Sequence, residues 1–145
     1  MRTKDVDRVY RILTNESVKK MTYFQDFTKE KIKSMLGCDG LYFLSPHRDS
    51  LFVFIQNNPV SCEGHSFVLP ERRGRKGIKD AQKAIQWLFD NTECVKVFGF
   101  TPENNVAANR FNALIGMKRE GLNTNSDMVD GKLQNRILWG ISKEV

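Results

Sequence analysis

A basic, glycine-rich turn between an apolar segment and an amphipathic segment constrains this chain more than any other feature. Residues 67–69 are apolar, Pro70 follows them, and helical spacing begins at Gly77. Between these points lie four cations and one further glycine: Arg72, Arg73, Gly74, Arg75 and Lys76. This order predicts a strand that passes through a tight turn into a helix.

Such a turn is able to bind an anion. The first backbone N–H groups of a helix have no partner inside the helix, and the helix dipole adds positive potential at the same end. Glycines let the backbone come close to phosphate oxygens because they carry no Cβ. The spacing alone leaves two interpretations open, a phosphate site and a surface turn whose charges are merely solvated.

Length and composition indicate one globular domain over residues 1–145, with 40% hydrophobic and 28% charged residues. The apolar runs are too short to cross a bilayer, and the N-terminal residues lack the apolar region of a secretory signal. Three cysteines without a paired spacing argue against a disulfide framework or a metal site. We therefore expect a cytoplasmic protein with no metal and no membrane partner.

The formal net charge is +6. This balance suits a polyanionic partner, which is either nucleic acid or a phosphorylated cofactor, and a basic surface without a specific partner remains an alternative.

The hydrophobic periodicity predicts an α/β (α+β) domain with a mixed sheet. Helical spacing occurs within residues 4–37 and again at 77–91 and 101–117, and strand patterns occur at 40–44, 50–56, 65–70, 94–100, 118–122 and 135–142. The pair Asp130-Gly131 predicts a hairpin turn between the last two strands. The aromatic residues of the first strands are interpreted as core: Tyr42, Phe43, Phe52 and Phe54.

Two linked motifs resemble those of the GNAT N-acetyltransferase superfamily. Val68-Leu69-Pro70 is similar to the strand end of that family, and Arg73-Gly74 to the start of its pyrophosphate loop, although Lys76 stands at the second glycine position. Further on, Asn105 and Ala108 match an N-x-x-A helix that leads to a segment, 115–121, similar to the family's lGFkreG ending. The resemblance covers roughly residues 40–142.

The resemblance implies a central, mostly antiparallel, twisted mixed sheet flanked by helices, with a splayed parallel strand pair at 64–69 and 94–100. It implies acetyl-CoA as co-substrate and an amine as acceptor. Backbone amides of Val68 and Leu69 would hold the pantetheine arm, and the remaining cofactor contacts would come from Arg73, Gly74, Arg75, Lys76, Gly77, Asn105 and Ala108.

The candidates for the general base are Glu63 and His65, which are two residues apart and so share one face of a strand. In a regular strand Val68 points to the opposite face, and the resemblance implies a β-bulge that brings the two faces together. The alternative is a partly buried structural histidine beside a turn carboxylate.

The usual general acid of the family is a tyrosine, and Asn112 occupies its position here. An asparagine is able to hydrogen-bond a departing sulfur but does not readily give it a proton. A slow, water-assisted or inactive enzyme therefore remains an alternative.

The leading hypothesis is an acyl-CoA-dependent N-acetyltransferase of unknown acceptor. The sequence of residues 62–92, together with Asn104-Asn105, is similar to that of small acetyltransferase-like proteins of tailed bacteriophages, so one alternative is an inactive virion or assembly protein with this fold. A nucleic-acid-modifying relative is another alternative, and a homodimer is a reasonable assembly.

Overall fold

The structure is a computed structural model that describes residues 1–20 and 26–144. Along the chain the elements are α1 (Val6–Leu13), α2 (Glu16–Lys19), α3 (Lys29–Leu36), β1 (Leu41–His47), β2 (Ser50–Asn58), β3 (Ser61–Val68), the short 3-10 helix η1 (Pro70–Arg72), α4 (Arg75–Asn91), β4 (Lys96–Pro102), α5 (Val106–Leu114), β5 (Lys118–Val129) and β6 (Lys132–Ser142).

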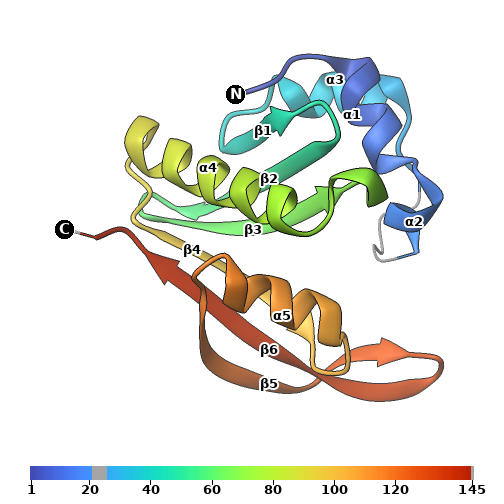
Figure 1. Ribbon diagram of the computed structural model, residues 1–145, viewed down its shortest axis with the longest axis vertical. Helices are drawn as coiled ribbons and strands as arrows, with labels where there is room; N and C mark the ends of the chain where they lie inside the picture. Colours follow the sequence, from blue (N-terminus) through green and yellow to red (C-terminus); the bar gives the residue numbers. More distant parts are fainter. Residues whose placement is uncertain (21–25, 145) are drawn as a thin grey trace.

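The described strands form one twisted sheet in the order β1-β2-β3-β4-β6-β5 (Figure 1). Neighbouring strands are antiparallel except for β3 and β4, which run parallel. The predicted mixed, mostly antiparallel sheet flanked by helices is confirmed.

Alternating side chains of β2 divide the core into two layers. Phe52 and Phe54 pack under α4 together with Leu88, while Leu51 and Val53 pack with α1 and α3 on the other face. Figure 1 shows α4 and α5 in front of the sheet and α1 and α3 at its upper edge. The predicted aromatic core is confirmed, because Phe43, Phe52 and Phe54 are buried and Tyr42 packs against the cluster that contains Phe52 and Phe54.

The helical region predicted over 4–37 consists of three short helices, and residues 21–25 of it lie outside the described residues. Each helix begins at a polar cap whose side chain accepts a backbone N–H: Asp5 from Arg8, Asn15 from Ser17 and Thr28 from Lys31. Helix α3 ends at Gly37, the residue predicted to stop it.

Several predicted boundaries were wrong. Strand β3 begins at Ser61 and not at 65, β4 covers Lys96–Pro102, and α4 begins at Arg75 rather than at Gly77. Strand β5 extends to Val129, because this exposed edge strand is mostly polar and carries little hydrophobic signal. The hairpin turn is confirmed, since Asp130 and Gly131 have positive φ values of 49° and 74°.

The parallel pair β3–β4 separates soon after it begins. The paired residues are Ser61 with Lys96, Cys62 with Val97 and Glu63 with Phe98. Both strands then continue, β3 to Val68 and β4 to Pro102, without pairing further with each other. The sheet therefore opens into a V between β3 and β4, as expected for a splayed parallel pair.

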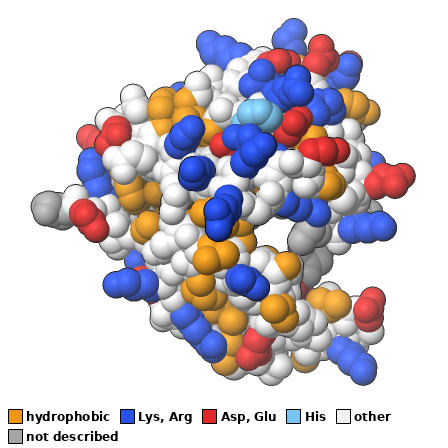
Figure 2. Space-filling model, viewed as in Figure 1, with side chains coloured by type: hydrophobic (Ala, Val, Ile, Leu, Met, Phe, Trp, Pro, Cys, Tyr) orange, Lys and Arg blue, Asp and Glu red, His pale blue; other side chains and the backbone are white. Residues whose placement is uncertain are grey.

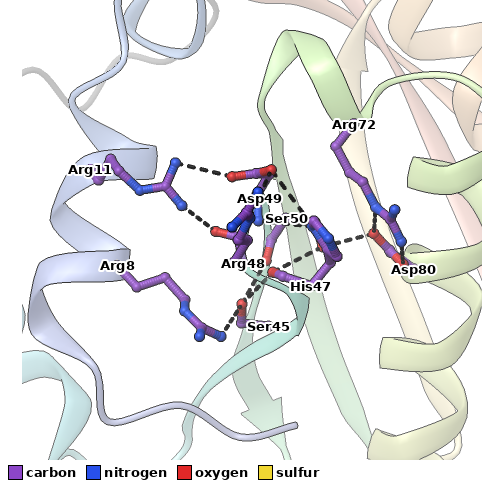
Figure 3. Close-up of polar contacts among 9 residues, drawn as sticks. All are labelled: Arg8, Arg11, Ser45, His47, Arg48, Asp49, Ser50, Arg72 and Asp80. Carbon is purple, nitrogen blue, oxygen red and sulfur yellow. Dashed lines mark hydrogen bonds and ion pairs between the residues drawn. The ribbon is translucent and has the colours of Figure 1, made fainter.

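A buried polar network fixes the turn that leads into α4 (Figure 3). Asp80 is 1% exposed, and its carboxylate accepts hydrogen bonds from Arg72 at 2.7 and 3.0 Å and from Ser50 at 2.9 Å. Burial alone would raise the pKa of Asp80. The hydrogen bonds from Arg72 and Ser50 and the charge of Arg72 outweigh that effect, and the pKa lies below its ordinary value of 3.8.

Replacing Asp80 by alanine should destabilise the fold, because Arg72 and Ser50 would lose their shared acceptor. We expect the melting temperature at neutral pH to fall by roughly 10 °C. Because the pKa of Asp80 is lowered in the folded state, its stabilisation is present above pH 3.8 and lost as the pH falls through the folded pKa. The difference between wild type and variant should therefore shrink in acid.

Calorimetric melting curves between pH 3 and 8 provide the measurement. Asp90→Ala is the matched control on the same helix, because Asp90 is exposed and accepts a hydrogen bond from Gln86 on that helix. Equal melting temperatures for Asp80→Ala and Asp90→Ala would contradict a stabilising role for the network.

Candidate functional site

The opening between β3 and β4 continues into a cleft of about 530 Å³. Its walls come from β3, β4, α4 and α5, with Val18 of α2 at one margin. Figure 2 shows the molecule hollowed between the part that carries α4 and the part that carries α5. The cleft thus lies where the sheet has no interstrand hydrogen bonds of its own.

The two glycines of the turn are required for different reasons. Gly74 is the N-cap of α4 and has φ 89° and ψ −145°, a conformation that is almost restricted to glycine. Gly77 is buried in the first turn of the helix. A Cβ there would lie 3.0 Å from the carbonyl oxygen of Arg72 and 3.3 Å from a methyl group of Val68. Gly77 therefore brings α4 close to the end of β3.

The N-terminus of α4 presents free amides to the cleft. No side chain among residues 1–20 and 26–144 caps this helix, and the amide of Ile78 donates to the carbonyl of Gly74. The amides of residues 74–77 consequently have no partner within the helix. Gly74 and Gly77 both line the cleft. This end of the helix has the geometry of an anion site.

The four cations of the turn divide into two groups. Arg72 is bound to Asp80, and Arg73 donates to the carbonyl of Val68 and to the hydroxyl of Ser17, each at 3.2 Å. Arg75 and Lys76 are exposed, and neither forms an ion pair with any described residue. Half of the predicted cation cluster therefore holds the turn together, and the other half remains for a ligand.

One of the two predicted strand amides is not available. The amide of Leu69 donates to the carbonyl of Asp49 at 3.0 Å, on the β2 side of the strand. Amide directions alternate along a strand, so the amide of Val68 points toward β4 and the opening. In this structure the amide of Val68, and not that of Leu69, is therefore available to a ligand, because the β3 edge that faces β2 is paired as far as Leu69.

The β-bulge expected in β3 is absent from the register. Residues 62–68 pair one to one with 50–56 of β2, and the irregularity lies at Gln56–Asn58. His65 lies opposite Val53 and so faces the α1 side of the sheet, while Val68 packs on the α4 side. Both nevertheless line the cleft, because the separated strands open it to both faces.

Glu63 and His65 form a pair beside this opening. The Nε2 of His65 lies 3.4 Å from Oε1 of Glu63, and both side chains are about one-third exposed. Burial lowers the pKa of His65 below its ordinary value of 6.5, and the charge of Glu63 opposes this shift. His65 is therefore neutral at physiological pH and has a lone pair with which to accept a proton.

Asn112 lies in the cleft but is already bonded. Its Nδ2 donates to Oγ1 of Thr101 at 2.8 Å, and both residues line the cavity. Because the Thr101 oxygen accepts this bond, its hydroxyl proton remains free to be donated. Thr101 was not among the predicted site residues, because it was placed at the start of a helix over 101–117, whereas it belongs to β4.

Asn105 and Ala108 lie at the start of α5, where the side chain of Asn105 accepts the amide of Ala108 at 3.1 Å. Asn105 is thus the N-cap of α5, and both residues line the cleft. Arg110 and Phe100 also line it and were not predicted.

Comparison with known proteins gives a clear result for the fold. No protein-family model and no curated protein matches the sequence. Among solved structures, spermidine N-acetyltransferase from Vibrio cholerae in complex with CoA and spermine is similar over 99% of this chain and 92% of its own, with a TM-score of 0.79 and 14% identity. An acetyltransferase of the GNAT family from Bacillus anthracis is similar over 96% of this chain and 89% of its own, with a TM-score of 0.73 and 17% identity. The chain has the GNAT fold.

The environment of His65 is directly testable. We expect its imidazole to titrate below pH 6.5, because burial disfavours the charged form. The Glu63→Gln variant should titrate lower still, since the carboxylate that stabilises the imidazolium is gone. NMR titration of the two histidines, assigned with His65→Gln, gives both values. A midpoint above 6.5, or one that rises in Glu63→Gln, would contradict the assignment.

Proposed function

We propose that this protein is an acyl-CoA-dependent N-acetyltransferase that transfers the acetyl group of acetyl-CoA to a primary amine. The observation that supports this most strongly is the position of the free amides of α4 beside the opening between β3 and β4. An anion site and an unpaired strand edge then face the same cleft. The GNAT fold of the chain agrees with this function.

Each part of acetyl-CoA has a counterpart in the cleft. The pyrophosphate would accept hydrogen bonds from the amides of residues 74–77, with Arg75 and Lys76 beside them. The pantetheine arm would extend along the open edge of β3, where the amide of Val68 points toward β4. The thioester then lies between the strands, within reach of both faces of the sheet. Asn105 and Ala108 would border the arm from α5.

His65 would act as the general base. The acceptor amine loses a proton to the neutral imidazole as its nitrogen attacks the thioester carbonyl, and Glu63 stabilises the imidazolium that forms. The C–S bond then breaks and coenzyme A leaves as a thiolate. Asn112 has no acidic proton to give. We therefore assign to the Thr101 hydroxyl a hydrogen bond to the departing sulfur. The thiolate finally takes its proton from water.

Binding of coenzyme A is the primary test. At a hundredfold excess over its dissociation constant it should stabilise the protein by about 2.7 kcal/mol, which raises the melting temperature by roughly 5–10 °C. The Arg75→Glu/Lys76→Glu variant should abolish this shift, because two repulsive charges replace two attractive ones at the phosphate site. Differential scanning fluorimetry in low-salt buffer provides the measurement.

Lys79→Glu/Lys83→Glu serves as the matched control, since both lysines are exposed on the same helix beyond its first turn. It changes the net charge equally and should retain the shift. If wild type shows no shift with coenzyme A, or if both variants lose it equally, the proposed cofactor site is wrong. An inactive protein with the same fold would then be the better interpretation.

The role of His65 is tested by kinetics. His65→Gln should lower kcat by about 10²- to 10⁴-fold while the coenzyme A shift persists, because the base acts only in the chemical step. In the wild type, kcat should rise with pH through the lowered pKa of His65 and be level by neutral pH. His47→Gln, which changes the other histidine outside the cleft, should retain full activity. If His65 had only a structural role, the His65→Gln variant would lose activity only in proportion to its loss of stability.

A further inference from the structure

We propose that the amine acceptor carries an anionic group, a carboxylate or a phosphate, and that Arg136 of β6 binds this group at the margin of the cleft. The inference rests on the proposed function and names the acceptor class for the same site. The neighbouring structure from Vibrio cholerae contains spermine, a polycation. The residues of this chain favour the opposite charge.

The lining of the cleft lacks the groups that a polycation needs. Among the described residues that line it, none is aspartate or glutamate, and three are basic or ionisable: His65, Arg73 and Arg110. Glu63, the nearest acid on β3, lies against His65 and supports the imidazolium. A polyamine would therefore find no carboxylate of its own along the cavity wall.

Arg136 is held in position by an aromatic ring and a hydroxyl group. Its guanidinium lies 4.8 Å from the ring centroid of Phe100, a residue that lines the cleft, and its Nε donates to the hydroxyl of Ser126 at 3.1 Å. No carboxylate among the described residues forms an ion pair with it. The two terminal nitrogens are thus oriented and remain available to a planar anion.

The cofactor phosphates do not account for Arg136. Phe100 and Phe98 alternate with Val97, which packs toward α4, so the two rings and the arginine above them face the other side of the sheet. Glu63 pairs with Phe98, and His65 faces the same side. Arg136 therefore shares its face with the base and not with the N-terminus of α4.

The same face offers an apolar surface for the body of the acceptor. Phe98 and Phe100 are half-buried, and their rings meet edge to face with centroids 6.4 Å apart and an interplanar angle of 84°. Helices α1 and α3 cover Phe43, Val53 and Phe67 on this face, and neither ring belongs to that cluster. An aliphatic or aromatic chain is thus able to lie between the base and the arginine.

The strand register sets the length of that chain. If pairing continued from Glu63–Phe98, His65 would be level with Phe100, whereas Arg136 pairs with Pro102, one strand further away and two residues along. Regular strand spacing and rise would place the backbones of His65 and Arg136 on the order of 12 Å apart, and the separation of β3 from β4 increases this distance. Arg136 reaches back over Phe100, so we infer an amine with a chain of several carbons between its nitrogen and its anionic group.

Matched acceptors of similar length test this directly. We would compare 6-aminohexanoate with hexane-1,6-diamine, which are nearly equal in length and carry opposite charges at the far end, and add 4-aminobutyl phosphate to distinguish carboxylate from phosphate. Calorimetric binding to the protein saturated with coenzyme A requires no turnover. The aminohexanoate or the phosphate should bind about tenfold more tightly than the diamine, and acetylation kinetics should show the same order in kcat/KM.

Arg136→Gln should remove this preference, and Arg136→Glu should favour the diamine. Lys132→Gln removes a charge from the exposed start of the same strand and should leave the preference intact. Equal or tighter binding of the diamine by wild type, or a preference that survives in Arg136→Gln, would overturn the proposal. Coenzyme A binding is measured separately, so a protein that binds coenzyme A but prefers the diamine refutes only the acceptor class.

Discussion

The separation of β3 from β4 is the constraint on which the rest of the structure depends. Two parallel strands pair for three residues and then diverge, which leaves backbone groups without interstrand partners inside a folded domain. Such groups are costly unless something binds them. Arg73 satisfies the carbonyl of Val68, whereas the amide of Val68 still faces the opening. The fold therefore contains a strand edge that an extended ligand is able to complete.

Holding that opening in shape requires the turn before α4 to be rigid. The chain uses Asp80, Ser50 and Arg72 for this purpose, together with a glycine at 77 that lets the helix approach β3. A charged pair in this buried position is a costly way to gain stability. It does fix the direction in which the amides of residues 74–77 point, so the anion site is organised before a ligand arrives and little ordering entropy opposes binding.

Sequence reasoning found the parts of the site that depend on local chemistry and missed those that depend on tertiary contacts. The turn, its glycines and the helix stripe followed from spacing, and the linked motifs placed the splayed pair. The sequence did not reveal that Arg72 has a structural role and Arg75 is exposed, because only the fold places Asp80 against Arg72. Likewise the expected bulge was unnecessary, since the separated strands let His65 and Val68 reach one cavity from opposite faces. Arg136 carried no signal, because only the fold brings it over Phe100.

The two faces of the opening carry separate positive groups, and this separation limits the chemistry. The exposed cations of α4 lie at its N-terminus on one face of the sheet, while Arg136 lies over Phe100 on the face of His65. A cationic acceptor on that face would bring like charges together in a partly desolvated cavity, at a cost that grows as water is excluded. Under the proposed function, a similar fold would take a different acceptor, because a few side chains on the sheet and not the sheet itself would select it.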